Sequence, residues 1–353
     1  MILFATDTYS ENPDSIFRLP AIREAIQGRD HKIIDLFEPF IPVAEAHEIR
    51  RTNTHKEYFA NRDPQHANEK FLSYMNDNLK FGDTLVLGTL DCVSLFLFPD
   101  TIRLIRNNWI KVVCFFGDDE FMLNRHAHWV ERFDLNVAYV KWCADYYNNI
   151  VPGSTYHLPL GSYFKKPDDL LLGIPDLRPD IEGDVVFVGS SFSDPDGERP
   201  SCLRHLIEKG VDVTIYGNGW DTMHGGFFQK NWKGYLPTTR VVDTIKRYKI
   251  SLAFLGDHLT GAPHMNASIW TAAAAGVGCF CTQYKPLFSD YGFTEGTNIV
   301  TFKYELDLSH AAKTWLETDH ILKTMGRNLY SFVIKNFNLV NLYKDFFKHI
   351  ENQ

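Results

Sequence analysis

Two polar loops that follow apolar runs contain residue types suited to binding phosphate. The first, GSSFSDPDGER, follows VVFV and contains Gly189, Ser190, Ser191 and Arg199. Small residues let backbone N–H groups approach an anion, a helix starting near Pro200 would add its positive end, and Arg199 would add a forked donor. The loop matches neither GxGxxG nor a P-loop and carries three acidic residues, so a solvated connection is an equal alternative.

The second loop is GNGW, directly after VTIYG. Gly217 permits positive φ and the close approach of a ligand, and Asn218 would lie beside that ligand. An ordinary turn at the end of a strand is the alternative. Further on, GDHLTGAPHMNASIW leads into an alanine-rich helix, with His264 and Asn266 before its start and Ser268 and Thr271 in its first turns. This helix start is a third candidate binding edge, unless the histidines are plain surface residues.

Three consecutive carboxylates follow the apolar run VVCFF, in FFGDDE. Asp118 or Asp119 at the mouth of a cleft would act as general base toward a hydroxyl acceptor, with His126 and His128 close by in the sequence. The alternative is an acidic helix start, where negative charge is favourable.

The sequence contains no convincing metal or cofactor motif. Asp194-Pro195-Asp196 has the DxD pattern of metal-binding carboxylates, but its proline favours a surface turn. Cys279 and Cys281 point to one side of a predicted strand without a second pair to complete a zinc site. HExxH, Walker A and GxSxG patterns are absent, so we expect no metal and no cofactor.

Apolar β-like runs alternate with helical patterns along the whole chain, which predicts an α/β protein with parallel sheets. We expect strands at 2–6, 31–35, 84–88, 111–116, 136–140, 154–158, 184–188, 212–217, 250–254, 278–282 and 298–302. We expect helices at 15–28, 68–79, 99–107, 239–247, 268–276, 307–318, 320–336 and 339–350, and an irregular or partly helical insertion at 44–63. A proline-rich stretch after Leu158 predicts a linker between two doubly wound domains with a cleft between them.

Length and composition agree with two cores. The chain has 353 residues, is 44% hydrophobic and carries a formal charge of -8, which disfavours a surface devoted to nucleic acid. The N-terminus lacks a basic region followed by an apolar run, and no apolar stretch is long enough to predict a membrane span. Six scattered cysteines, mostly in apolar strands, predict reduced thiols and a cytoplasmic protein.

The run from VVFVGSS to GNGW, then GYLP, KISLAFL and MNASIWTAAAAGVGCFCTQYKPLFSDYGF resembles the C-terminal domain of CgeB-like, spore-maturation-type glycosyltransferases. FFGDDE, FDLNVAYVKWCADYY and YHLPLGS resemble segments of that family's first half. The similarity covers roughly residues 80–345, and phage DNA β-glucosyltransferase has the same order of features. The resemblance implies the GT-B architecture, with domains at 1–165 and 166–335 and a C-terminal helix at 336–353 packing back on the first domain.

Carried over from the family, the donor diphosphate would contact Gly189, Ser190 and Arg199. Gly217 and Asn218 would lie near the base, and Asn266 would open the donor-binding helix. The family helix usually has Arg and Glu where this chain has Ser268 and Thr271. Each lost contact forfeits about 1.5–3 kcal/mol unless neighbouring groups such as Arg199, Lys249 or His264 compensate.

We therefore expect a metal-independent glycosyltransferase, hexosyl or pentosyl, that uses a nucleotide sugar such as a UDP-sugar and a hydroxyl acceptor. That acceptor would be a glycan, a small molecule or a modified DNA base. One alternative is a non-catalytic relative that binds a nucleotide sugar or glycan, which Ser268 and Thr271 favour. Another is a phage-type transferase acting on hydroxymethylpyrimidine DNA, which predicts a basic stripe: Arg50, Arg51, Lys56, Arg62, Arg103 and Arg106.

Overall fold

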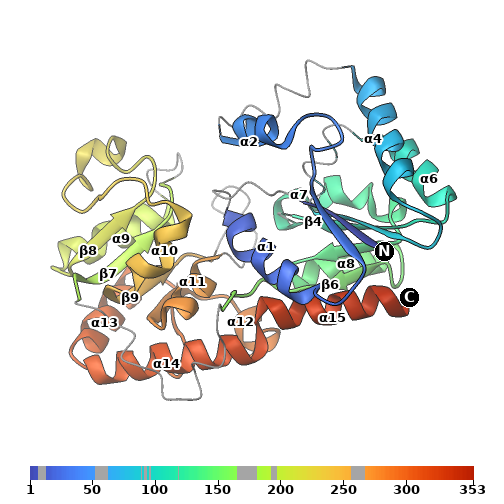
Figure 1. The fold of residues 1–353 in the computed structure, drawn as a ribbon. Coiled ribbons are helices and arrows are strands. Elements are labelled where there is room, and N and C mark those ends of the chain that lie inside the picture. The colour runs from blue at the N-terminus through green and yellow to red at the C-terminus, as the bar shows by residue number, and fades with distance from the viewer. Residues whose placement is uncertain are drawn as a thin grey trace. The chain divides into compact units, whose positions relative to one another are not determined.

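The computed structural model describes residues 1–6, 13–51, 63–88, 90, 94, 97–117, 119–164, 181–191, 197–255 and 267–353. The chain divides into two compact units, Met1–Pro159 with Val340–Gln353, and Leu160–Leu339. Residues 165–180, most of the predicted linker, lie outside the described part. Each unit has its own sheet and its own hydrophobic core (Figure 1).

The first unit contains a six-stranded parallel sheet in the order β2-β1-β3-β4-β5-β6. Its strands are β1 (Ile2–Thr6), β2 (His31–Asp35), β3 (Thr84–Leu87), β4 (Lys111–Phe116), β5 (Leu135–Ala138) and β6 (Thr155–His157). Its helices are α1 (Pro13–Ala25), α2 (Val43–Arg51), α4 (Pro64–Asn78), α6 (Pro99–Asn107), α7 (Asp119–Ala127), α8 (Lys141–Ile150), α15 (Leu339–Asn352) and the 3-10 turn η1 (Val130–Arg132). The chain moves outward from β1 to β2 and then returns to the other side of β1 to form β3.

The last helix of the chain, α15, belongs to the first unit (Figure 1). The ring of Phe347 lies 6.3 Å from that of Phe4 on β1, and Phe346 lies 5.2 Å from Phe115 on β4. Edge-on aromatic pairs of this kind add to the free energy gained by burial. One face of the first sheet is therefore closed by a segment more than 200 residues later in the chain.

The second unit contains a five-stranded parallel sheet in the order β11-β10-β9-β7-β8. Its strands are β7 (Gly183–Val188), β8 (Val213–Tyr216), β9 (Tyr248–Ala253), β10 (Gly278–Thr282) and β11 (Val300–Phe302). Its helices are α9 (Glu198–Glu208), α10 (Thr238–Ile245), α11 (Ala267–Ala275), α12 (Pro286–Ser289), α13 (Glu305–Leu316), α14 (Asp319–Asn336) and the 3-10 turn η3 (Met223–Gly226). The two doubly wound sheets confirm the predicted α/β class.

Both faces of the second sheet are buried. Val185 and Phe187 pack in one apolar cluster, whereas Val186, between them on β7, packs in another. On β10, Phe280 lies on one side and Cys279 and Cys281 on the other, all fully buried. Burial on two faces explains why these strands are continuous apolar runs rather than alternating ones.

Several helices differ from the prediction. The insertion at 44–63, expected to be irregular or partly helical, begins with the helix α2, and its residues 52–62 lie outside the described residues. The helix α8 was not predicted, because its sequence KWCADYYNNI is rich in residues with modest helix propensity. Its buried Cys143, Ala144 and Tyr147 show that packing on the sheet stabilises it.

A close helix contact in the second unit gives a first prediction. A Cβ added to Gly326 of α14 would overlap the carbonyl oxygen of Gly276, which is backbone and cannot rotate away. Helix propensity alone predicts that Gly326→Ala stabilises by about 0.5–1 kcal/mol. We expect the overlap to dominate, lowering the free energy of unfolding by about 1–3 kcal/mol.

Urea denaturation followed by circular dichroism measures this difference. Gly292→Ala is the matched control in the same unit, because Gly292 has a φ of 73° but its nearest new contact is a side-chain atom at 3.9 Å. The control should cost about 1–2 kcal/mol from backbone strain alone. A Gly326→Ala protein as stable as the wild type would contradict the proposed overlap.

Candidate active site

The order of strands in the second sheet selects one edge for ligand binding. β7 lies between β9 and β8, so the chain leaves β7 in one direction for β8 and returns on the other side for β9. In open parallel sheets, ligands bind outside the carboxyl ends of strands at such a switch point. The residues after β7, from Gly189 to Ser191, are therefore at this switch point.

The loops after β7 and β8 are joined by backbone hydrogen bonds. Gly189 donates to the carbonyl of Tyr216 at 2.9 Å, and Ser191 donates to the carbonyl of Asn218 at 3.0 Å. Gly217 has a φ of 133°, and a Cβ on it would overlap the Gly189 carbonyl. A Cβ on Gly219 would lie 2.6 Å from the Ser191 hydroxyl. Glycine is required at 217 for conformation and for space.

Two tryptophans fix the carbonyl groups of these glycines. The indole N–H of Trp220 donates to the Gly189 carbonyl at 2.7 Å, and that of Trp232 donates to the Gly217 carbonyl at 2.7 Å. Trp220 is completely buried between Phe187 and Phe228. With the carbonyls held in this way, the turn of each loop is set by the core beneath it.

Arg199 lies in the first turn of α9 and reaches back to the first loop. Its Nη1 donates to the Ser190 carbonyl at 3.3 Å, and its guanidinium carbon lies 5.9 Å from the ring centre of Phe187. Partial burial lowers the pKa of Arg199 to about 10, and the neighbouring Glu198 opposes that shift. The guanidinium therefore remains protonated at neutral pH in a partly desolvated position, where an anion interacts with it more strongly than in water.

The carboxylates beside Arg199 differ in their environment. Burial raises the pKa of Glu198, and the negative charge of Glu305 raises it further, against the opposite effect of Arg199. Glu305 at the start of α13 accepts a hydrogen bond from Ser201 at 2.5 Å, which lowers its pKa. A second anion close to Glu198 is thus held in its charged form.

The predicted residues of the third loop are only partly described. His264 and Asn266 lie outside the described residues, whereas Ser268 and Thr271 are in α11. The hydroxyl of Thr271 is buried and donates to the Ser268 carbonyl at 3.0 Å, inside the helix. Lys249, considered above as a compensating cation, forms an ion pair with Asp184 at 2.7 Å.

In the first unit, the strand order places the switch point between β1 and β3. A Cβ on Gly88, just after β3, would lie 2.5 Å from the hydroxyl of Thr6 at the end of β1, so the two strand ends are in contact. Asp118 lies outside the described residues, and Asp119 is the first residue of α7. His126 is fully buried and packs 5.0 Å from the ring of Phe116, so it is a core residue.

The described part of the chain has neither a cluster of metal-ligand side chains nor a membrane-crossing helix. Within the described ranges, no group of three or more His, Cys, Asp or Glu side chains is arranged to hold a metal ion. Among the same residues, none of the helices has the length and apolar character needed to cross a bilayer.

Comparison with known proteins identifies the fold. Residues 199–348 match a family model described as "Glycosyl transferase-like", which includes α9 and most of the second unit. A search of curated proteins finds no match. Several solved structures are similar over nearly the whole chain.

HepE from Anabaena, solved with UDP and glucose, aligns with a TM-score of 0.65 at 12% identity over 100% of this chain and 99% of its own. Sucrose-phosphate synthase from Thermosynechococcus elongatus aligns with a TM-score of 0.60 at 11% identity over 99% and 98%. The pneumococcal O-GlcNAc transferase GtfA, solved with UDP and GlcNAc, aligns with a TM-score of 0.53 at 12% identity over 80% and 59%. The chain therefore has the predicted GT-B fold, and its residues 199–348 match the "Glycosyl transferase-like" family model.

The structure brings five predicted residues together: Gly189, Ser190, Ser191, Gly217 and Asn218, with Arg199 hydrogen-bonded to the same group. Sequence reasoning missed the two tryptophans that anchor these loops. Trp220 is visible in the sequence as part of GNGW, but nothing in the pattern indicates that its N–H reaches Gly189.

The raised pKa of Glu198 predicts a pH effect on stability. The folded-state pKa lies above the ordinary value of 4.5, so the native protein binds this proton more tightly than the unfolded chain. The free energy of unfolding from this group therefore falls as pH rises from about 4.5 through the folded pKa. Glu198→Gln removes the charge that lowers the free energy of unfolding at high pH. The variant should therefore be more stable than the wild type at neutral pH and lose that advantage in acid.

Urea unfolding curves measured across that pH range test this expectation. Glu208→Gln serves as control, because Glu208 is exposed at the far end of the same helix. A Glu198→Gln protein less stable than the wild type at pH 7 would show that the carboxylate is favourably paired instead.

Proposed function

We propose that this protein is a glycosyltransferase that moves a sugar from a nucleotide sugar, with UDP as the nucleotide, to a hydroxyl acceptor. The observation that carries the proposal is the pair of interlocked glycine loops after β7 and β8, with Arg199 beside them. HepE has been solved with UDP-glucose and GtfA with UDP and GlcNAc, both in similar folds.

In this proposal the donor diphosphate lies against the loop from Gly189 to Ser191 and beside Arg199. Transfer leaves negative charge on that diphosphate, and groups that face it in fixed positions lower the barrier most. The half-buried guanidinium supplies a fixed positive charge, and the small residues leave room for oxygens next to the backbone. No metal is required, because these groups supply the stabilisation.

An acceptor hydroxyl needs a base, which we assign to Asp118 or Asp119 after β4. A carboxylate there would accept the hydroxyl proton as the sugar is transferred. The burial of His126 in the core removes it from this role. The five cysteines free of disulfides among the described residues are consistent with a cytoplasmic site of action.

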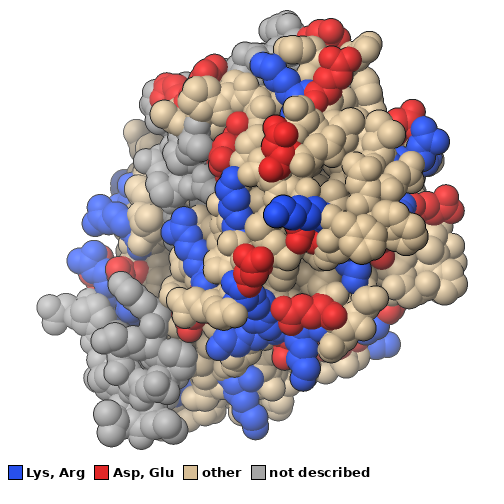
Figure 2. All heavy atoms as spheres, turned by 45° about the vertical axis from the view of Figure 1, so that its right-hand side comes forward, with Lys and Arg blue, Asp and Glu red and all other residues tan. Residues whose placement is uncertain are grey.

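Two alternative functions can be weighed against the described residues. A non-catalytic relative is favoured by Ser268 and Thr271, since the Thr271 hydroxyl is engaged inside its own helix. A phage-type DNA-base transferase needs a basic stripe, but Arg103 lies 3.1 Å from Asp100 and Arg106 lies 2.8 Å from Asp134. Charges of both signs are mixed on the face drawn in Figure 2. We propose that this glycosyltransferase belongs to the CgeB-like subfamily.

The donor site predicts the effect of Arg199→Ala on ligand stabilisation. A nucleotide sugar at about 100 times its dissociation constant stabilises the native state by about 2.7 kcal/mol, visible as a rise in melting temperature. In a panel of UDP-, GDP- and ADP-sugars we expect the largest rise with a UDP-sugar, and its loss in Arg199→Ala.

Arg204→Ala is the matched control, since Arg204 lies on the same helix and stacks 5.2 Å from the Phe227 ring. It should keep the full rise. An unchanged rise in Arg199→Ala would place the phosphates elsewhere, and binding of every donor without transfer or hydrolysis would favour the non-catalytic relative.

Metal independence is tested by chelation. If Arg199 and the loop stabilise the leaving group, release of UDP from the donor should proceed at the same rate in EDTA as in added Mg²⁺ or Mn²⁺. UDP release is measured by a coupled assay, with Arg199→Ala as the inactive reference. Loss of turnover in EDTA that Mg²⁺ restores would contradict this part of the proposal.

A further inference from the structure

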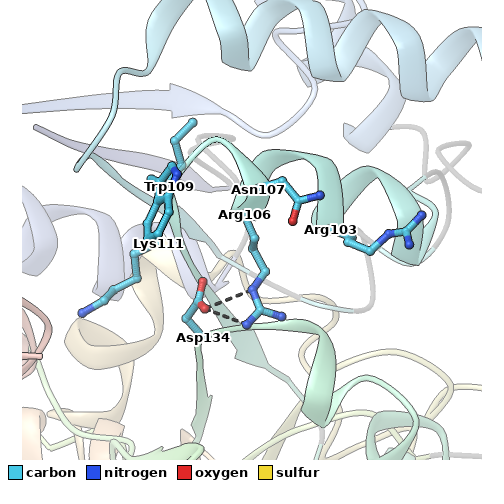
Figure 3. A pocket seen from close by; sticks show the side chains of 7 residues that line it. Arg103, Arg106, Asn107, Trp109, Lys111 and Asp134 are labelled. Carbon is cyan, nitrogen blue, oxygen red and sulfur yellow. Dashed lines mark hydrogen bonds and ion pairs between the residues drawn. The ribbon is translucent and has the colours of Figure 1, made fainter.

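A pocket of about 510 Å³ opens in the first unit (Figure 3). Its lining comes from the end of α6, the start of β4 and the residue before β5: Arg103, Arg106, Asn107, Trp109, Ile110, Lys111 and Asp134. The strand β4 runs from Lys111 at this pocket to Phe116 next to Asp119. The pocket is thus at the amino edge of the sheet, and its volume is in the range of small-ligand sites.

One wall of the pocket is the indole of Trp109, which is 73% exposed. Trp109 follows the C-cap of α6 and has a φ of 61°, and it is the one non-glycine residue with positive φ in the described part of the chain. Glycine normally occupies this position because a side chain there costs free energy. The chain therefore holds a large apolar ring in solvent in an unfavourable conformation, which indicates a role outside folding.

Backbone hydrogen bonds hold the main chain at Trp109, and a second aromatic ring lies beside its indole. The backbone N–H of Trp109 donates to the Arg106 carbonyl at 2.9 Å, and the backbone carbonyl of Trp109 accepts from the Gly82 N–H at 3.1 Å. Phe81, 77% exposed, lies with its ring centre 6.0 Å from that of Trp109. Together the two rings form an exposed aromatic surface.

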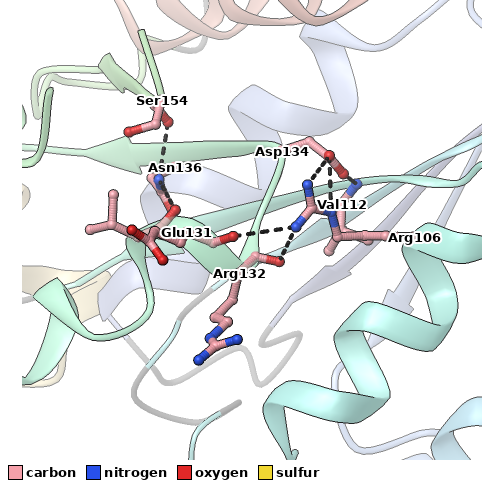
Figure 4. A network of polar contacts seen from close by, with 8 residues as sticks. Arg106, Val112, Glu131, Arg132, Asp134, Asn136 and Ser154 are labelled. Atoms are coloured by element: carbon pink, nitrogen blue, oxygen red, sulfur yellow. Dashed lines mark hydrogen bonds and ion pairs between the residues drawn. The ribbon is translucent and has the colours of Figure 1, made fainter. Parts of the chain in front are cut away.

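The polar residues of the pocket are held by a network of hydrogen bonds (Figure 4). Nε of Arg106 donates to Asp134 Oδ1 at 3.0 Å, and its Nη1 donates to the carbonyls of Glu131 and Arg132 at 3.3 and 3.1 Å. The other carboxylate oxygen of Asp134 accepts from the Val112 N–H at 2.8 Å. The Asn107 amide is on the same side, with no partner among the described residues.

From this arrangement we propose a second ligand site, for an oligosaccharide, on the amino edge of the first sheet. A sugar ring has an apolar C–H face that packs on an aromatic ring and hydroxyls at its rim that need oriented donors and acceptors. Trp109 and Phe81 provide the aromatic surface. Asp134, Arg106 and Asn107 provide the hydrogen-bond donors and acceptors. A membrane surface fits less well, because insertion of the rings would desolvate the ion pair and the amide at the same wall.

This site does not depend on sugar transfer at the second unit, and it holds a glycan chain without reacting with it. A carbohydrate bound here lies at the sheet edge opposite the proposed base, so its binding should be independent of the donor. Lys111 borders the pocket with its Nζ on the Ile350 carbonyl at 3.0 Å. Because Lys111 is positively charged, acidic and neutral glycans are tested separately.

The test is titration of the full chain, without nucleotide, with maltotetraose, cellotetraose and oligogalacturonate, followed by calorimetry. Trp109→Gly is the decisive variant, because glycine relieves the positive φ and should leave the melting temperature unchanged or higher. We expect binding of at least one tetrasaccharide and its weakening by about tenfold or more in Trp109→Gly. Tyr146→Ala, which removes a part-exposed aromatic ring from α8 of the same unit, should bind as the wild type does.

Three results would overturn the proposal. One is that no tetrasaccharide binds at millimolar concentration. Another is that binding persists undiminished in Trp109→Gly. The third is that phosphatidylserine vesicles or a thymidine oligonucleotide bind through Trp109 while the glycans do not. Donor thermal shifts measured in parallel keep the outcome separate from the proposed function, since Trp109→Gly should leave them intact.

Discussion

The contact between the glycine backbones after β7 and β8 is the constraint on which the candidate donor site depends. Gly217 approaches the Gly189 carbonyl so closely that no side chain fits between them, and its φ is open to glycine. The indoles of Trp220 and Trp232 then hold the two carbonyls from the core side. The Ser190 carbonyl in the same loop accepts a hydrogen bond from Arg199, so the cation is positioned by the fold.

In a parallel sheet, the loops at the carboxyl edge and those at the amino edge form two separate surfaces. Since both faces are covered by helices, only the loops at the strand ends are available for ligands. In the first unit, the carboxyl edge carries Asp119, whereas the amino edge carries the aromatic and ion-paired pocket around Trp109. The helix α15 packs on one face of this sheet through Phe346 and Phe347, and the Ile350 carbonyl near its end accepts a hydrogen bond from Lys111 of the pocket.

Much of the fold was predictable because strands buried on two faces are continuous apolar runs. The strands at 2–6, 31–35, 111–116 and 278–282 have the predicted bounds. The helix α8 was missed, since Tyr146, Tyr147 and Asn148 have little local preference for helix and only packing forms it. At the site, Gly189, Gly217 and Arg199 could be singled out from residue type, but hydrogen bonds to Trp220 and Trp232 span 31 and 15 residues and leave no local pattern.

The amino-acid sequence by itself determined the alternation of strands and helices and the glycines that must lie at strand ends. These properties follow from local sterics and from the period of apolar residues, which any segment carries within itself. Only the tertiary structure decided that the glycine loops after β7 and β8 lock together, that Arg199 is half-buried beside them and that His126 belongs to the core. The tertiary structure also showed that Trp109 lines a pocket and has a positive φ. Exposure and φ depend on neighbours distant in the chain, so the sequence does not reveal them.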